Sequence, residues 1–216
     1  MENKIKALIT SKDYEAIGRV LSNDRSLANE VLAYDDVNIT KAHPLHRLCD
    51  GVFSNKYTDD EALEMAKVFL SHGADVNGNQ VPEKHDTPLI AAASLHADKV
   101  AIFYIENGAD IHHAGTHGGT ALHWAAWCGR SKVVSKLIEV GADINKLCID
   151  FKATPLFWAV LGLKRGHKKE FQNHLECVTL LVQAGADRNI PNVDGKTVFD
   201  LLDDQDMTLK EVLSRV

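Results

Sequence analysis

The chain of 216 residues has few cysteines and no long apolar run, and both shortages exclude classes of protein. Its four cysteines include no Cys-x-x-Cys pair, so a zinc knuckle and a redox pair have no local support. The longest apolar stretch, about residues 155–163, is far shorter than the roughly 20 residues of a membrane helix. No secretory signal is visible, and we therefore expect a cytoplasmic protein.

An excess of positive charge is also missing. Lys and Arg together number 24 against 30 Asp and Glu, which gives a net charge of −6 and no global signature of a nucleic-acid binder. With 45% apolar and 25% charged residues, the composition is that of an ordinary globular protein. We expect a soluble chain that binds neither nucleic acid nor a membrane.

Motifs of catalysis and cofactor binding are absent as well. The sequence contains no P-loop, no nucleophile elbow, no His-Glu-x-x-His and no dinucleotide fingerprint. Among the 11 histidines, His112, His113 and His117 lie close together, but no cysteine or carboxylate accompanies them at a recognised metal spacing. We expect no metal, no cofactor and no enzymatic activity.

The sequence does contain an internal repeat. The tripeptide Gly-Ala-Asp starts at Gly73, Gly108, Gly141 and Gly185, at separations of 35, 33 and 44 residues. A second signal precedes each copy, and its four forms are His43-Pro44-Leu45-His46, Thr87-Pro88-Leu89-Ile90, Thr120-Ala121-Leu122-His123 and Thr154-Pro155-Leu156-Phe157. A degenerate fifth copy is found at residues 197–200. The spacing indicates a structural unit repeated along the chain.

The residue types of the repeat favour two helices per unit. Proline suits the first turn of a helix, where its missing N–H costs nothing, and Thr or His precedes it at the cap position. Val133, Val134 and Leu137 fall on one face of a second helix. The glycine of each Gly-Ala-Asp suits a helix end that needs a left-handed residue. One such unit cannot bury its apolar face alone, so neighbouring units must stack.

This pattern resembles the ankyrin repeat family, with its period near 33, its Thr-Pro-Leu-His-x-Ala motif and its closing Gly-Ala-Asp-Val-Asn. The match is best at residues 119–146 and extends over about 41–205. The resemblance implies an all-α ankyrin-repeat solenoid of stacked helix-turn-helix units with extended fingers. It also implies a non-enzymatic protein–protein interaction module.

We predict a single ankyrin-repeat domain over residues 1–216. An N-terminal cap (1–40) should precede four repeats (41–84, 85–117, 118–151 and 152–194) and a C-terminal cap (195–216). The first cap should have two short helices, one with Ile5, Leu8 and Ile9 and one with Tyr14, Ile17, Val20 and Leu21. The second cap should have a helix at residues 198–202 and a closing helix with Leu209, Val212 and Leu213.

The resemblance places a partner in the concave groove formed by the first helices and the fingers. Carried over position by position, it aligns Leu95, Trp127 and Leu161 across three adjacent repeats, with Trp127 as an anchor. Arg47 is predicted to reach into the same groove. The alternative is that neighbouring side chains or an insertion cover these residues.

Apolar finger tips are the other candidates for partner binding. Leu147, Ile149 and Phe151 alternate as on a strand edge, and Val81 and Pro82 form a smaller tip. The alternative is that these side chains pack on the next finger.

Four further residues have structural interpretations. We assign Trp124 and Trp158 to a core ladder of aromatic rings. His46 and His123 match the structural histidine of the family, which forms hydrogen bonds across turns.

Two insertions separate the first and second helices of their repeats. Residues 50–64 carry a net charge of −4, and residues 162–174 carry a net charge of +3. Thr58 and Glu61 form a capping-box pattern that should start a lengthened helix. The charges either cover solvated faces or form two prongs that orient a partner.

The most specific function that follows is binding of an unidentified protein or peptide by a monomer. One alternative is a self-associating structural scaffold, and another is a bacterial effector or adaptor that engages a host protein. A third follows from the resemblance: Asn145 matches the finger asparagine that an asparaginyl hydroxylase modifies in animal cells.

Overall fold

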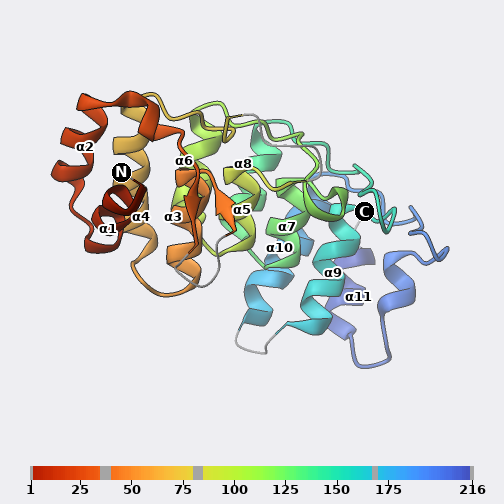
Figure 1. The fold of residues 1–216 in the computed structure, drawn as a ribbon. Helices are drawn as coiled ribbons and strands as arrows, with labels where there is room; N and C mark the ends of the chain where they lie inside the picture. Colours follow the sequence, from red (N-terminus) through yellow and green to blue (C-terminus); the bar gives the residue numbers. More distant parts are fainter. Residues whose placement is uncertain (1, 35–39, 80–84, 167–169, 215–216) are drawn as a thin grey trace. The chain divides into compact units, whose positions relative to one another are not determined.

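The computed structural model describes residues 2–34, 40–79, 85–166 and 170–214. The chain divides into two compact units, one of Met1–Pro82 with Asp86–Asp110 and one of Glu83–His85 with Ile111–Val216. Helices packed in pairs build both units (Figure 1). None of the helices in the described ranges combines the length and the hydropathy of a membrane-spanning segment. The single domain over 1–216 stays a prediction.

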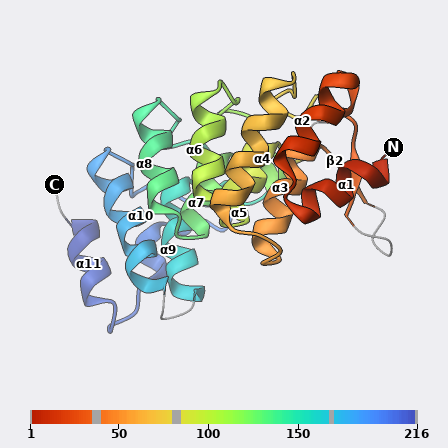
Figure 2. The same ribbon diagram turned by 90° about the vertical axis from the view of Figure 1, so that its left-hand side faces the viewer.

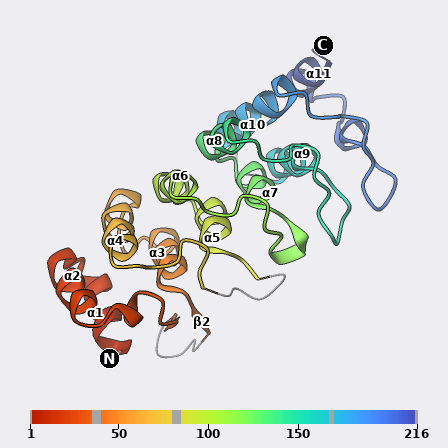
Figure 3. The ribbon, with the colours of Figure 1, turned by 90° about the horizontal axis from the view of Figure 1, so that it is seen from above.

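The first unit has two layers of helices after its N-terminal helix. Its elements are α1 (Glu2–Ser11), α2 (Tyr14–Asn23), η1 (Arg25–Ala28), β1 (Leu32–Ala33), β2 (Lys41–Ala42), α3 (Pro44–Phe53), α4 (Asp59–Ser71), α5 (Pro88–Ser94) and α6 (Asp98–Glu106). Seen from above, α3 packs beside α5 in one layer, and α2, α4 and α6 follow one another in the other (Figure 3). The two predicted cap helices are confirmed as α1 and α2, with Ile5, Ile17 and Leu21 buried.

The acidic insertion lengthens α4 through the predicted capping box. The Thr58 N–H donates to a Glu61 carboxylate oxygen at 2.8 Å, and the Glu61 N–H donates to the Thr58 hydroxyl oxygen at 3.2 Å. Cations of neighbouring elements pair with these acids: Lys12 lies 2.9 Å from Glu61, and Lys99 lies 2.5 Å from Asp60. Much of the negative charge of this insertion is therefore compensated inside the first unit, while its role in orienting a partner stays a prediction.

Arg47 supports the β1–β2 hairpin rather than an open groove. Its Nε donates to the Leu32 carbonyl at 2.9 Å, and its other guanidinium nitrogens bond to Asp50 and to the Thr40 carbonyl. Only 10% of its side chain is exposed. Arg47 therefore has a structural role inside the unit, and its contact with a partner stays a prediction.

The second unit repeats the two-layer arrangement. Its elements are η2 (Thr116–Gly118), α7 (Ala121–Trp127), α8 (Ser131–Glu139), α9 (Pro155–Arg165), α10 (Phe171–Gln183), η4 (Val198–Leu201) and α11 (Met207–Ser214). In Figure 2, α8 and α10 lie side by side, and the α7–α9 pair forms the other layer. The closing helix is confirmed as α11, with Leu209, Val212 and Leu213 buried.

The last predicted helix, at residues 198–202, is a single 3-10 turn instead. It ends at Leu201 because Leu202 is already extended, with φ −89° and ψ 142°. The Asp200 carboxylate accepts the Thr197 N–H at 2.7 Å and completes a capping box. A sequence that caps a helix strongly can still support only one turn where the chain leaves helical geometry.

Asparagine side chains join successive fingers inside each unit. In each case the side-chain oxygen of an asparagine accepts the N–H of the aspartate in the following Gly-Ala-Asp. The pairs are Asn29–Asp75 (2.7 Å), Asn77–Asp110 (2.7 Å) and Asn145–Asp187 (2.9 Å). Three of the four Gly-Ala-Asp copies, those that start at Gly73, Gly108 and Gly185, therefore donate the same hydrogen bond to an asparagine side chain.

Candidate functional site

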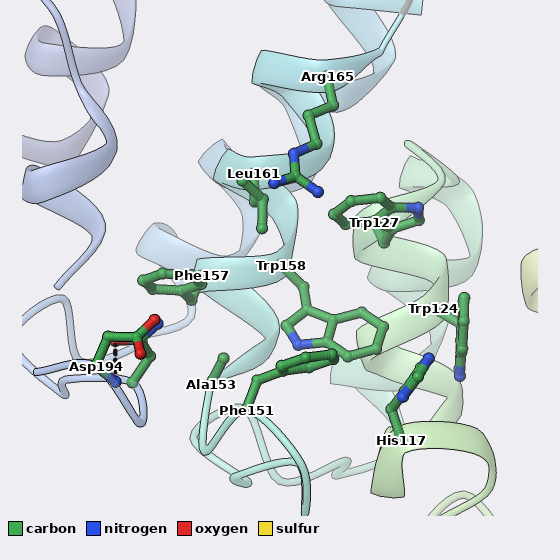
Figure 4. Close-up of a pocket in the computed structure, with 11 residues that line it drawn as sticks. His117, Trp124, Trp127, Phe151, Ala153, Phe157, Trp158, Leu161, Arg165 and Asp194 are labelled. Atoms are coloured by element: carbon green, nitrogen blue, oxygen red, sulfur yellow. Dashed lines mark hydrogen bonds between the residues drawn. The ribbon is translucent and has the colours of Figure 1, made fainter. Parts of the chain in front are cut away.

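A cavity of about 400 Å³ opens on the second unit between α7, α9 and the finger loops (Figure 4). Its aromatic lining consists of Trp124, Trp127, Phe151, Phe157 and Trp158. The remaining lining residues are His117, Ala153, Leu161, Arg165, Asn192 and Asp194. We call this cavity the aromatic pocket. Its volume lies in the range typical of ligand-binding pockets, about 300–1,000 Å³.

Helical spacing explains why these residues face one cavity. Trp124 and Trp127 are three residues apart on α7, so they lie on the same face of that helix. Trp158, Leu161 and Arg165 have spacings of three and four on α9 and also share a face. The two faces belong to neighbouring helices of one layer, which brings the side chains together.

Trp158 is the centre of the aromatic cluster and is only 6% exposed. Its ring centroid lies 5.2 Å from that of Trp124 at an interplanar angle of 82°, and 6.1 Å from that of Trp127 at 74°. The Phe151 ring lies at 6.3 Å. Edge-to-face contacts of this kind are favoured between aromatic rings, so the packed rings form a preformed pocket wall. The predicted aromatic pair of Trp124 and Trp158 exists, but it lines a pocket as well as packing.

His123 fixes the finger that carries Phe151 against α7. The Thr120 N–H donates to its Nδ1 at 3.1 Å, and its Nε2 donates to the Ala153 carbonyl at 3.2 Å. These bonds require the neutral imidazole with its proton on Nε2. Burial lowers the pKa of His123 from 6.5 to about 4. The structural role predicted for His123 is thus observed, since it holds a segment of the pocket in place.

The predicted structural role of His46 in the first unit has a similar basis. The ring bonds to the backbone of Asp86, and burial lowers the pKa of His46.

The finger tips beside the pocket are apolar and exposed. Leu147, Ile149 and Phe151 expose 40%, 46% and 44% of their surface. The Ile149 N–H donates to the His117 carbonyl at 3.1 Å, and the Val193 N–H donates to the Phe151 carbonyl at 2.8 Å. The expected strand edge is corrected to a series of turns, because these bonds link separate fingers instead of forming a ladder.

His117 holds a second finger at the pocket rim. Its φ of +59° lies in the left-handed region, which is uncommon for a residue other than glycine. Its Nδ1 lies 2.9 Å from an Asp150 carboxylate oxygen, and its ring lies 5.2 Å from that of Phe151.

Two unlike polar groups lie on different sides of the pocket. The Arg165 guanidinium stands 6.0 Å from the centroid of the Trp127 ring. Asp194 lies on the side of Phe157, where its own N–H donates to the Asn192 side chain at 3.0 Å (Figure 4). In addition, the Nε1 of Trp124 is buried and has no hydrogen-bond partner among the described residues. The pocket is therefore apolar in its centre and polar at its rim.

The structure brings together three of the predicted partner-binding residues: Trp127, Leu161 and Phe151 all line the aromatic pocket. Leu95 belongs to the first unit, so its alignment with Trp127 stays a prediction. Val81 and Pro82 lie outside the described residues.

The sequence interpretation missed several lining residues: Trp124, Trp158, Phe157, His117, Arg165, Asn192 and Asp194. The spacing of three or four residues from Trp127 and Leu161 was a usable signal for Trp124, Trp158 and Arg165.

No group of three or more His, Cys, Asp or Glu side chains that could hold a metal occurs within the described ranges. All four cysteines lie in these ranges, and none forms a disulfide.

Paired helices joined by finger loops define a helical repeat protein. Two family models match the sequence: "Ankyrin repeats (3 copies)" over residues 56–148 and "Ankyrin repeat" over residues 152–193. The chain belongs to the ankyrin repeat family, whose repeats are generally protein-binding modules.

Curated relatives resemble part of the chain. Palmitoyltransferase Hip14 of Drosophila melanogaster is 34% identical over 91 residues, which cover 42% of this chain and 13% of the relative. Palmitoyltransferase ZDHHC13 of Mus musculus is 33% identical over 139 residues, 59% of this chain and 20% of the relative. The putative palmitoyltransferase ZDHHC13 of Danio rerio is 31% identical over 135 residues, 57% of this chain and 19% of the relative. The matched region thus spans a fifth or less of these relatives' length.

Proposed function

We propose that the protein is a non-enzymatic binding module whose aromatic pocket holds a segment of a partner protein. The observation that carries this proposal is the pocket itself, in which five aromatic residues surround a cavity of about 400 Å³. Apolar surface removed from water contributes roughly 25 cal/mol per Å², so an apolar side chain of a partner gains free energy by entering. Tryptophan is also enriched among the residues that dominate binding energy.

The exposed finger tips extend the proposed contact surface. Leu147, Ile149 and Phe151 stand beside the pocket with 40% or more of their surface open. Large exposed apolar side chains gathered in one place are a mark of an interaction site. A stable complex would bury about 1,200–2,000 Å² in total, so the pocket would supply the anchor and the finger tips part of the remaining contact.

The test compares the chain with a double variant, Trp127→Ala/Phe151→Ala, in an affinity pull-down followed by mass spectrometry. Partners enriched by the wild type are then titrated against both proteins. We expect the double variant to lose about 2 kcal/mol or more of binding free energy, roughly thirtyfold in Kd, because it removes two rings of the pocket.

Phe171→Ala is the matched control, since Phe171 is 41% exposed at the start of α10 and does not line the pocket. Circular dichroism of each variant verifies that the fold is kept. Equal affinity of the wild type and the double variant for every enriched partner would remove the pocket from the proposal.

The finer parts of the proposal are a monomeric state, a cytoplasmic location and the absence of a catalysed reaction. A self-associating scaffold is the alternative, and light scattering over a range of concentrations distinguishes the two. The relatives named palmitoyltransferases suggest one setting for such a module, the recruitment of proteins to a palmitoyl transfer reaction.

A further inference from the structure

The rim of the aromatic pocket carries unlike charges on different sides, and this restricts what can enter. Arg165 stands over Trp127, whereas Asp194 lies on the side of Phe157 (Figure 4). Trp158 lies on the pocket wall. An occupant of the apolar centre therefore meets a cation at one side and an anion at the other.

Arg165 is available for a carboxylate. It forms no ion pair with an acid among the residues that the structure describes, whereas the preceding Lys164 lies 2.7 Å from Asp203 and also binds Asp206. A guanidinium near an aromatic ring keeps its N–H donors, and these bind a carboxylate through two parallel hydrogen bonds. Arg165 is exposed, so its guanidinium is open to a carboxylate that approaches the pocket rim.

Trp124 has a second hydrogen-bond donor that lacks an acceptor. The Nε1–H of Trp124 is buried and unpartnered among the described residues. Leaving a buried donor unsatisfied costs about 1–3 kcal/mol, so an acceptor brought by the occupant would be stabilising. Trp124 would gain that acceptor only by a movement of its indole ring, because the nitrogen is covered in the free pocket.

The two acidic residues near the pocket restrict the orientation in which a peptide segment can bind. Asp150 already pairs with His117 at 2.9 Å. Asp194 would repel a carboxylate placed beside it but would accept a hydrogen bond from a backbone N–H. An acidic segment therefore fits with its carboxylate at Arg165 and its N–H groups toward Asp194.

We propose, on the basis of the function proposed above, that the aromatic pocket recognises a peptide segment with a large apolar side chain close in sequence to an aspartate or glutamate. The apolar side chain packs against Trp158 and Leu161. The carboxylate binds the Arg165 guanidinium.

The experiment selects binders from a displayed library of randomised dodecapeptides on the full chain and on three variants. The variant Arg165→Glu reverses the charge at the rim, and Lys132→Glu makes the same change at an exposed site on α8. The variant Trp127→Ala tests whether a selected peptide uses the pocket. Selected peptides are then synthesised and titrated by intrinsic fluorescence. All three tryptophans of the sequence line the pocket, so their emission reports its occupancy.

We expect the wild type and Lys132→Glu to enrich peptides with an apolar residue near an acid. Arg165→Glu should bind these peptides at least about tenfold more weakly than the wild type does. It should bind versions of the peptides with Lys in place of the acid more tightly than the wild type binds those versions. Peptides that need Trp127 but show no preference for acids, or that are indifferent to Arg165→Glu, would overturn this inference and leave the proposed function standing. Failure to select any peptide that needs Trp127 would overturn both.

Discussion

Lowering the pH should reduce the free energy of unfolding of the second unit, because His123 becomes protonated. The pKa of this residue is lowered from 6.5 to about 4 by burial, so the unfolded chain takes up a proton at a higher pH than the folded chain does. The contribution of the neutral imidazole to stability is therefore complete above pH 6.5 and is lost as the pH falls from 6.5 toward 4. At pH 5 the loss is about 2 kcal/mol, and below pH 4 it approaches about 3 kcal/mol.

Urea unfolding followed by tryptophan fluorescence measures this effect in the second unit, because all three tryptophans lie there. The variant His123→Gln removes the titrating group but keeps a residue that completes a capping box with Thr120. We expect the wild type to lose about 2 kcal/mol more than His123→Gln between pH 7.5 and pH 5.

Other titrating groups are common to both proteins, so their contributions cancel in this comparison. An identical loss in the wild type and in His123→Gln would refute the reasoning, since it would mean that His123 accepts its proton as readily when folded.

Two further predictions concern residues that shape the pocket. Gly118→Ala should cost about 2 kcal/mol or more, because Gly118 has φ +67° and a Cβ there would lie 2.3 Å from Cγ1 of Ile149. Gly141→Ala should cost only about 1 kcal/mol of folding stability, because its φ of +87° is similar but the space around an added Cβ is open. Equal urea midpoints for the two variants would contradict the role of the Ile149 contact. Trp158→Ala should cost about 3–5 kcal/mol and lower the Tm more than Trp127→Ala does, because Trp158 contacts three other aromatic rings of the pocket and is nearly buried. Thermal unfolding by circular dichroism compares them, and an equal loss of Tm would show that Trp158 is not the centre of the cluster.

The periodic features of the fold were predictable from the sequence. Gly-Ala-Asp and the Thr-Pro-Leu motif act locally, through helix ends and first turns, so the copies at residues 87, 120 and 154 predict where their first helices begin. Thr154 illustrates this, since its hydroxyl accepts the Phe157 N–H at 3.2 Å and Pro155 begins α9. The capping box at Thr58 and Glu61 is confirmed for the same reason.

The site was only partly predictable from the sequence. The burial of each side chain and the conformation of each finger loop depend on contacts between repeats. Trp158 was assigned to the core from its place in the motif, and nothing in its spacing showed that a cavity would open beside it. The alternation of Leu147, Ile149 and Phe151 resembles a strand, but the bonds to His117 and Val193 bend this finger into turns. Arg47 looked available because its partners, among them the Leu32 and Thr40 carbonyls, are backbone atoms that a sequence pattern does not reveal.

The hydrogen bonds between asparagine side chains and the next Gly-Ala-Asp link neighbouring repeats in the same way each time. The donor is a main-chain N–H, so any residue type except proline could supply it, and the acceptor is one side chain, as in Asn77–Asp110 and Asn145–Asp187. Replacing one of these asparagines therefore removes a link, whereas replacing the aspartate by another residue with a main-chain N–H leaves this donor in place. The side chains that line the aromatic pocket take no part in these bonds, so they can differ without removing a link of this kind.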